Sequence, residues 1–158
     1  MLIISVIGEG NARPEIEALA EQVGQGLARQ GHAVVCGGLG GVMEAVCRGA
    51  KSAGGTTIGI LSGDDPKSAN PWVDGPSCTG MGHARNVIVT KTGRAVIAIG
   101  GAYGTLSEIG HALSDGVPVI GLKTWAMSRS GHDDDGVIVA SDAEDAVAKA
   151  IQAANSRT

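Results

Sequence analysis

The chain is poor in aromatic residues. Its 158 residues include two Trp, one Tyr and no Phe, although 43% of the residues are hydrophobic. This apolar content excludes intrinsic disorder, and the 26 glycines do not follow the repeat of three that marks collagen. The hydrophobic core must therefore be built from Val, Ile, Leu and Ala. Such an aliphatic core is typical of a parallel sheet that is covered by helices on both faces.

Positive charge is scarce as well. Twelve Lys and Arg are outnumbered by sixteen Asp and Glu, which gives a formal net charge of −4. Proteins that bind nucleic acid generally present a basic surface, and single-strand binders add aromatic rings on which bases stack. We therefore do not expect nucleic acid as a partner.

Cysteine is limited to Cys36, Cys47 and Cys78. An odd number of widely spaced cysteines predicts reduced thiols in the cytoplasm, and the spacing matches no zinc site. The N-terminal apolar segment lacks the positive region of a signal peptide and is far shorter than the ~20 apolar residues of a membrane span. We expect a cytoplasmic protein with no membrane association and no metal held by its own side chains.

Short apolar strands alternate with helical patterns along the chain. Strands are expected at 2–7, 33–36, 57–61, 95–99, 117–122 and 137–140. Helices are expected from residue 14, from residue 42, over about 82–92, over 105–114, and from a cap at Ser141 or Asp142 to about residue 154. Two polar stretches interrupt this alternation, a long irregular loop at 62–80 and a loop around 128–135.

This order of elements predicts a single domain over residues 1–158. Its fold class is α/β, a doubly wound Rossmann-like domain with a mostly parallel sheet. In such a sheet, ligands bind beyond the carboxyl ends of the strands. Loops as long as 62–80 are commonly functional, so this one is expected to influence ligand specificity.

Three glycine-rich segments follow strands of the expected sheet. They contain the candidate ligand-binding residues Gly8, Glu9, Gly10, Gly37, Gly38, Gly40, Gly41, Gly100, Gly101, Tyr103, Gly104 and Thr105. Glycine lets the backbone approach a ligand closely, and a helix that begins directly afterwards offers free N–H groups and its positive dipole end to a phosphate. Each segment alone is equally consistent with a tight turn. Three of them at one sheet edge favour a shared phosphate or anion site.

Two common nucleotide-binding motifs are absent. Arg13 stands where a dinucleotide fingerprint would have its third glycine, and no acidic residue follows the strand that ends at Cys36. The chain also lacks the Gly-Lys-Ser/Thr sequence of a P-loop. Neither a nicotinamide-dependent dehydrogenase nor a P-loop nucleotide hydrolase is supported.

Two charged residues lie near the glycine-rich segments. Thr105 and Glu108 have the spacing of a capping box, but Glu108 is also a candidate catalytic carboxylate. Arg85, which precedes Asn86 at the start of an expected helix, can hold a phosphate through two parallel hydrogen bonds. The alternative interpretation of Arg85 is a solvated surface residue.

Several motifs together resemble LOG-like Rossmann proteins. The matching segments, in chain order, are 37–45, 59–61, 85–86 and 100–108, and the similarity covers about residues 2–122. This superfamily includes cytokinin-activating nucleotide phosphoribohydrolases, proteins mislabelled as lysine decarboxylases, molybdenum cofactor carrier proteins and relatives of the DNA-processing protein DprA.

The carrier-like branch is the more similar one. The hydrolases have a Pro-Gly-Gly-x-Gly-Thr-x-x-Glu motif, whereas here Ile99 replaces the proline and Ala102-Tyr103 takes the place of one residue. Arg85-Asn86 resembles the carriers, while the hydrolases tend to have Arg-Lys. The resemblance implies that Arg85 and Glu108 would be the catalytic pair of a hydrolase. It also implies a homo-oligomer, a dimer or tetramer, and no lysine decarboxylation.

The sequence therefore predicts a cytoplasmic binding or carrier protein. Its expected partner is a phosphorylated small molecule, nucleotide-like or pterin-like, and the resemblance suggests molybdenum cofactor as the carried ligand. No other cofactor is expected. The alternative is an enzyme that hydrolyses the N-glycosidic bond of a nucleoside 5′-monophosphate. A third class, a module associated with nucleic acid, conflicts with the acidic charge balance.

Overall fold

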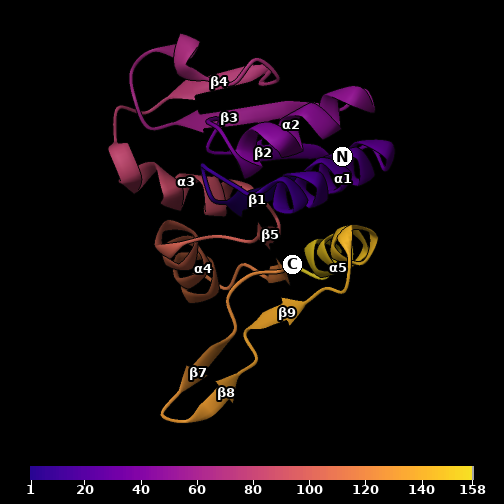
Figure 1. Cartoon of the computed structure of the whole chain (residues 1–158), viewed down its shortest axis with the longest axis vertical. Coiled ribbons are helices and arrows are strands. Elements are labelled where there is room, and N and C mark those ends of the chain that lie inside the picture. Colours follow the sequence, from indigo (N-terminus) through magenta and orange to yellow (C-terminus); the bar gives the residue numbers. More distant parts are fainter. Residues whose placement is uncertain (158) are drawn as a thin grey trace.

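A parallel sheet of seven strands forms the centre of the computed structural model, which describes residues 1–157 (Figure 1). The strand order across the sheet is β4-β3-β2-β1-β5-β6-β9, and every neighbouring pair is parallel. The strands are β1 (Ile3–Gly8), β2 (Ala33–Cys36), β3 (Thr57–Leu61), β4 (Gly75–Cys78), β5 (Val96–Ile99), β6 (Val119–Leu122) and β9 (Val137–Val139). The prediction of a doubly wound α/β fold with a mostly parallel sheet is confirmed.

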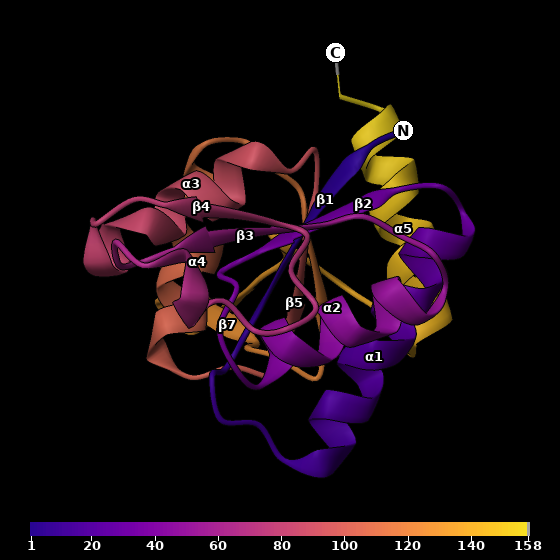
Figure 2. The same ribbon diagram turned by 90° about the horizontal axis from the view of Figure 1, so that it is seen from above.

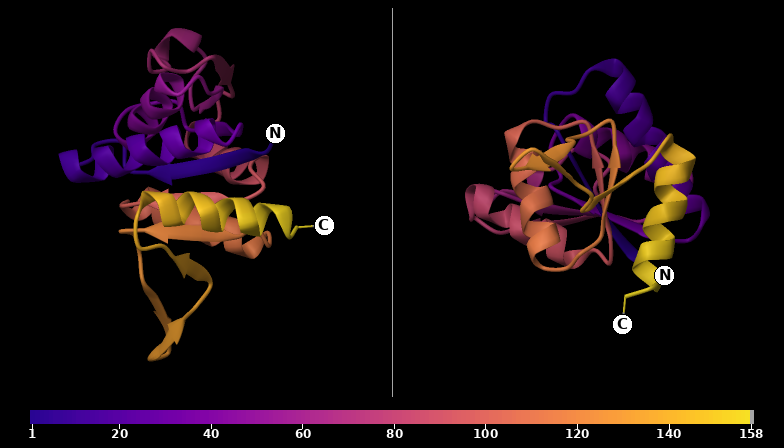
Figure 3. Two further views of the ribbon diagram at one scale, coloured as in Figure 1. Left: turned by 90° about the vertical axis from the view of Figure 1, so that its right-hand side faces the viewer. Right: turned by 90° about the horizontal axis from the view of Figure 1, so that it is seen from below.

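Helices cover both faces of the sheet. They are α1 (Pro14–Arg29), α2 (Val42–Ser52), α3 (Arg85–Thr92), α4 (Tyr103–Ser114) and α5 (Ala143–Asn155), with short 3-10 turns at η1 (Pro66–Ser68) and η2 (Gly82–Ala84). Seen from above, α1, α2 and α5 lie on one side of the strands, and α3 and α4 lie on the other (Figure 2). Helices α1 and α5 run side by side although the sequence separates them widely (Figure 3).

The core is correspondingly divided into two aliphatic layers. One layer joins the sheet to α1, α2 and α5, and the other joins it to α3 and α4. Neighbouring residues of β1 show the division, because Val6 packs in the first layer and Ile7 in the second. Both faces of the central strands are therefore buried, which explains their nearly continuous apolar sequences. Within residues 1–157, no fully buried member of either layer is aromatic, although the half-buried Trp125 packs against the second layer.

The stretch at 62–80 differs from the irregular loop that we expected. It contains η1 and the edge strand β4, which pairs in parallel with β3 from Gly75 to Cys78. All four residues of β4 are exposed and include Pro76, so the segment has none of the apolar pattern of a strand. Asp74 anchors its start, because its carboxylate accepts a hydrogen bond from Thr57 N–H at 3.0 Å and pairs with Lys51 at 2.9 Å.

The prediction of a polar loop around 128–135 is wrong, because this segment forms a hairpin. Strands β7 (Met127–Arg129) and β8 (His132–Asp134) pair in antiparallel fashion and project from the end of the molecule opposite β4 (Figure 1). The turn between them has φ of 51° at Ser130 and 80° at Gly131. Positive φ at both central residues is the geometry of a type I′ turn, one of the two favoured two-residue hairpin turns.

The sheet order places a switch point between β1 and β5. From β1 the chain builds outward through β2 and β3 to β4, whereas β5 starts the opposite half that continues to β6 and β9. Gly8 at the end of β1 pairs with Ile99 at the end of β5. The loops that follow these two strands diverge, and such a divergence leaves a crevice at the carboxyl edge of the sheet.

Candidate functional site

A cavity of about 190 Å³ lies at this switch point. We call it the α4 cavity. Its lining comes from the ends of β1 and β2 and from the first turns of α2, α3 and α4, namely Val6, Ile7, Gly8, Glu9, Gly10, Gly37, Met43, Arg85, Asn86, Ala102, Gly104, Thr105 and Glu108. Segments from all three glycine-rich regions and the candidate pair Arg85 and Glu108 therefore meet at one place.

The first turn of α4 presents unpaired backbone donors to this cavity. Ala102 occupies the N-cap position, and no side chain caps the helix. The first helical hydrogen bond runs from Leu106 N–H to Ala102 O at 3.1 Å, so the N–H groups of residues 103–105 have no acceptor within the helix. Gly104 and Thr105 line the cavity. Together with the positive end of the helix dipole, these donors form a typical anion seat.

Two glycines of the lining are required by close packing. A Cβ placed on Gly8 would lie 2.6 Å from Ile99 O, and a Cβ on Gly37 would lie 2.7 Å from both Arg85 Nη2 and Met43 Sδ. Both distances are shorter than real Cβ contacts. Glycine at these positions therefore lets β1, β5 and the Arg85 side chain converge around the cavity.

Glu108 does not close a capping box. Helix α4 begins at Tyr103, two residues earlier than expected, and the side chain of Thr105 caps nothing. Glu108 is only 9% exposed, and no hydrogen bond to its carboxylate is found within residues 1–157. Burial raises the pKa of Glu108 to about 7, while the charge of Arg85 opposes this rise. The side chain is therefore close to half protonated at neutral pH.

Arg85 is buried rather than solvated, with 8% of its surface exposed. Its Nε donates to Ile60 O at 2.9 Å, Nη1 donates to Asn86 Oδ1, and Nη2 donates to Gly37 O at 3.5 Å. Burial lowers the pKa of Arg85, and the nearby carboxylate of Glu108 counteracts this shift. A guanidinium has five N–H donors, so these three bonds leave two for a ligand.

The other glycines of the second segment support the fold instead. Gly38 and Gly41 have φ of 74° and 63°, a conformation that side chains disfavour. A Cβ on Gly41 would lie 2.2 Å from Glu9 O, and a Cβ on Gly40 would lie 3.2 Å from Gly10 O. Gly40 and Gly41 therefore pack against the loop after β1, and Gly38 packs against β3. None of the three lines the α4 cavity, and their contact with a ligand stays a prediction.

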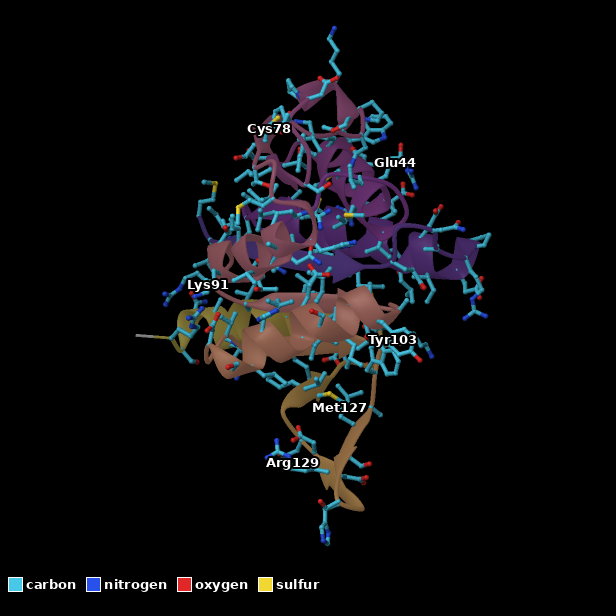
Figure 4. The ribbon with its side chains drawn as sticks, turned by 90° about the vertical axis from the view of Figure 1, so that its left-hand side faces the viewer. Glu44, Cys78, Lys91, Tyr103, Met127 and Arg129 are labelled. Carbon is cyan, nitrogen blue, oxygen red and sulfur yellow. The ribbon has the colours of Figure 1, made fainter. Side chains whose placement is uncertain are left out.

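The third segment is split between two cavities. Gly104 and Thr105 line the α4 cavity, whereas Gly100 and Gly101 line an adjoining cavity of about 600 Å³. Tyr103 is the first residue of α4 and faces solvent, with 79% of its surface exposed (Figure 4). Tyr103 does not line the α4 cavity, and a ligand contact of Tyr103 stays a prediction.

Some lining residues were not foreseen. The side chain of Met43 in α2 borders the α4 cavity beside Gly37. Lys123 and Trp125 line the adjoining cavity from the loop after β6. For Lys123, its position directly after a buried strand was the available signal. Met43 carries no comparable signal, because an apolar residue in a helix predicts only core packing.

Two buried thiols lie behind the second glycine segment. Cys36 and Cys47 share a hydrogen bond with 3.6 Å between their Sγ atoms, and Gly38 N–H donates to Cys36 Sγ at 3.3 Å. This shared bond and burial raise the pKa of Cys47, so it stays a neutral thiol. Cys78 is exposed on β4, and all three cysteines are free.

The described part of the chain has neither a metal-binding cluster nor a membrane-spanning helix. Within residues 1–157, no group of three or more His, Cys, Asp or Glu is arranged to hold a metal ion. Over the same residues, no helix combines the length and the apolar character that crossing a membrane demands.

Residues 1–149 match the model of the SLOG cluster4 family. The chain belongs to this family. An uncharacterized protein of Archaeoglobus fulgidus is 46% identical over 126 residues, which cover 78% of this chain and 81% of that protein. The resemblance to LOG-like Rossmann proteins that the motifs indicated is thereby confirmed.

Two solved structures share both the fold and appreciable sequence identity. The molybdenum cofactor binding protein of Rippkaea orientalis is 36% identical with a TM-score of 0.86, and the match covers 96% of each chain. The molybdenum cofactor carrier protein of Chlamydomonas reinhardtii is 31% identical with a TM-score of 0.84, covering 97% of this chain and 98% of that one.

Proposed function

We propose that this protein binds and carries a phosphorylated pterin-like or nucleotide-like molecule, with molybdenum cofactor as the leading ligand. The similarity to two proteins that are named for binding or carrying molybdenum cofactor supports a carrier or binding role. The observation that carries the proposal is the uncapped first turn of α4, which lines a cavity shared with Arg85.

In this proposal, the ligand's phosphate lies on the first turn of α4. The N–H groups of Gly104 and Thr105 and the Thr105 hydroxyl donate to it, and Arg85 contributes its two remaining N–H donors and its charge. Glu108 would repel a phosphate only when ionised. Because its pKa is about 7, anion binding is expected to weaken as the pH rises through neutrality.

The size of the α4 cavity limits how a ligand can lie. Its 190 Å³ is below the roughly 300–1,000 Å³ of complete small-molecule sites. The cavity can therefore take a phosphate and the group next to it, while the rest of the ligand extends outward past Glu9, which also borders the adjoining cavity.

The variant Gly104→Asp tests the phosphate seat. A Cβ at Gly104 meets nothing within 4 Å, so the fold tolerates the side chain, while the added carboxylate repels a phosphate at the helix end. Calorimetric titration with molybdenum cofactor and with AMP should show at least a ~10-fold loss of affinity, about the value of one charge-assisted hydrogen bond. The matched control is Gly110→Asp on the same helix, where a Cβ also meets nothing within 4 Å. Equal affinities for both variants would refute the seat.

A second candidate function is hydrolysis of a nucleoside 5′-monophosphate to free base. The observation that favours it is that Glu108 and Arg85 line the same cavity. The Glu108 carboxylate takes no part in capping α4, and burial raises its pKa to about 7. Glu108 would stabilise positive charge that develops on the ribose or orient a water molecule, and Arg85 would anchor the substrate.

Base release from AMP and its N6-substituted analogues tests this alternative. Wild type should release free base, and Glu108→Gln should be at least ~100-fold slower, the contribution typical of a positioned acid or base. Equal rates for the two proteins would remove Glu108 from the reaction, and no release from any nucleotide would leave only the carrier role.

We further propose that the protein acts in the cytoplasm as a homo-oligomer, a dimer or tetramer, without nucleic acid. Three free cysteines are consistent with a reducing compartment, and the net charge of −4 disfavours a nucleic-acid surface. Light scattering of the purified protein gives the oligomeric state, and a gel shift at low salt tests binding to DNA.

A further inference from the structure

The adjoining cavity of about 600 Å³ has a lining unlike that of the α4 cavity. It lies beyond the carboxyl ends of β5 and β6, and Glu9 borders both cavities. We call it the Lys123 cavity. Its polar and aromatic lining comes from Arg13 before α1 and from residues 123–125 after β6.

Two cations and one carboxylate line the Lys123 cavity. Arg13 and Lys123 face one carboxylate, Glu9, whereas the chain as a whole has a net charge of −4. Arg13 is already paired with Glu15 at 3.3 Å, but no ion pair to Lys123 is found in the described part of the chain. Lys123 also has φ of 56°, a conformation that is uncommon for a residue with a side chain. An exposed lysine is thus held directly after a buried strand, at the mouth of a cavity.

Thr124 adds a polar atom without a partner. Its Oγ1 is buried and is the one side-chain N or O atom in residues 1–157 that is buried without a hydrogen bond. Buried hydroxyls are nearly always paired, so such an atom calls for an acceptor or donor from outside the chain. Thr124 lines the Lys123 cavity and also a neighbouring cavity of about 340 Å³, so this unpaired hydroxyl lies in the wall between them.

Trp125 forms an aromatic wall that is joined to the anion seat. Its Nε1 donates to Ala102 O at 3.1 Å, and its ring packs against Tyr103 with 5.7 Å between centroids. Ala102 is the N-cap of α4 and lines the α4 cavity. The Trp125 ring is therefore positioned by the turn that presents the free amides, and aromatic faces of this kind stack on heterocyclic rings.

Glu9 and Gly100 mark the junction of the two cavities. A Cβ on Gly100 would lie 2.8 Å from Glu9 Oε1, so any larger residue would intrude on this carboxylate. The Glu9 carboxylate accepts hydrogen bonds, which suits hydroxyl or amino groups of a ligand that passes from one cavity to the other.

From this juxtaposition we infer that the two cavities form one site for a ligand with two linked phosphates and a terminal aromatic ring, that is, a dinucleotide-type molecule joined by a pyrophosphate. One phosphate lies on the first turn of α4 with Arg85, and the second lies by Lys123. The ring beyond it packs on Trp125. The inference rests on the proposed function, because the first phosphate uses the seat described there, and it adds the class of ligand.

Titration with AMP, ADP and diadenosine diphosphate tests the inference. The Trp72→Phe variant makes Trp125 the sole tryptophan, so its fluorescence reports occupancy of the Lys123 cavity. We expect diadenosine diphosphate to bind at least ~10-fold more tightly than AMP, the value of one added charge-assisted contact, and to change the Trp125 emission more than AMP does.

Two substitutions of Lys123 locate the source of this preference. Lys123→Gln removes the charge and keeps most of the length of the side chain. Lys123→Gly also removes the charge, and because glycine adopts φ of 56° without strain, this variant should fold even if Lys123→Gln does not. Either should bring the affinity ratio of diadenosine diphosphate to AMP close to one. Lys67→Gln, at an exposed lysine of η1, is the matched control and should keep the full ratio.

The outcomes separate this inference from the proposed function. Equal affinity for AMP and diadenosine diphosphate, or a preference that survives both Lys123 variants, would overturn the two-phosphate site. The phosphate seat on α4 would still stand after such a result, provided that the Gly104→Asp variant loses AMP binding. If none of the three probes binds, the inference and the proposed nucleotide-like ligand fail together.

Discussion

The glycine-rich loops after β2 and after β5 are similar in sequence, but their glycines have different roles in the structure. In the first, residues 37–41, Gly41 fits a space closed by Glu9 O, and Gly37 alone borders the α4 cavity. In the second, residues 100–104, Gly104 faces open space at the start of α4. Gly41 therefore holds the first loop against its neighbour, whereas Gly104 leaves room for a ligand at the end of the second loop. The preceding Gly100 and Gly101 are closely packed as well. A count of glycines cannot distinguish these roles, because the role depends on what lies opposite the missing Cβ.

Replacing a glycine of the first loop should break the fold before it affects binding. In Gly41→Ala, the new Cβ would lie 2.2 Å from Glu9 O at a backbone φ of 63°. We expect a loss of about 4 kcal/mol in the free energy of unfolding, from the left-handed backbone and overpacking combined. Urea denaturation followed by circular dichroism measures it, and a loss below about 1 kcal/mol would contradict the structural role of this loop.

The carboxylate behind the second loop should make stability depend on pH. Burial raises the pKa of Glu108 from 4.5 to about 7, so the folded protein binds a proton that the unfolded chain releases between these values. The contribution of Glu108 to the free energy of unfolding is therefore fully present below pH 4.5 and is lost as the pH rises to about 7. The expected total is about 3 kcal/mol.

The measurement compares wild type with Glu108→Gln by urea denaturation across pH 5–8, the range in which Glu108 ionises. Other titrating groups are common to both proteins, so the difference isolates Glu108. Parallel curves would show that Glu108 keeps an ordinary pKa and would remove its proposed influence on anion binding.

The smallest effect is expected at the second loop itself. A Cβ at Gly104 meets nothing within 4 Å, and the residue lies in the first turn of a helix. Gly104→Ala should therefore raise the free energy of unfolding by about 0.5 kcal/mol, because alanine favours the helix and restricts the unfolded chain. A thermal melt beside Gly41→Ala gives the contrast directly. Similar destabilisation by both substitutions would erase the distinction between the loops.

Most of the fold could be predicted because its strands are buried on both faces. Segments such as Val96–Ile99 are apolar throughout, and helical periods separate them. The structure departs from prediction where packing leaves no such pattern. Strand β4 is an exposed edge with the sequence Gly-Pro-Ser-Cys, and the β7–β8 hairpin depends on its turn more than on apolar alternation.

The grouping of most candidate residues at one cavity could be predicted from the sequence, but the packing of each residue could not. That these residues bind a ligand stays a prediction. All three glycine-rich segments contribute to the α4 cavity, and Arg85 and Glu108 meet there as the resemblance implied. The capping hypothesis for Glu108 failed because α4 starts at Tyr103 rather than at Thr105. A shift of two residues at a helix start is within the usual uncertainty of sequence patterns. Here it means that the Glu108 carboxylate has no capping role in α4. The oligomeric state, the cytoplasmic location and the lack of nucleic acid stay predictions.

The projecting hairpin has a consequence for how the molecule is handled by proteases. Within residues 1–157, strands β7 and β8 pair only with each other, and the Arg129 side chain is 86% exposed near their turn. A two-stranded hairpin without a covering layer opens more readily than a central sheet. Trypsin should therefore nick the chain after Arg129 first. The two fragments should stay associated, because β6 and β9, which flank the nick, belong to the same sheet.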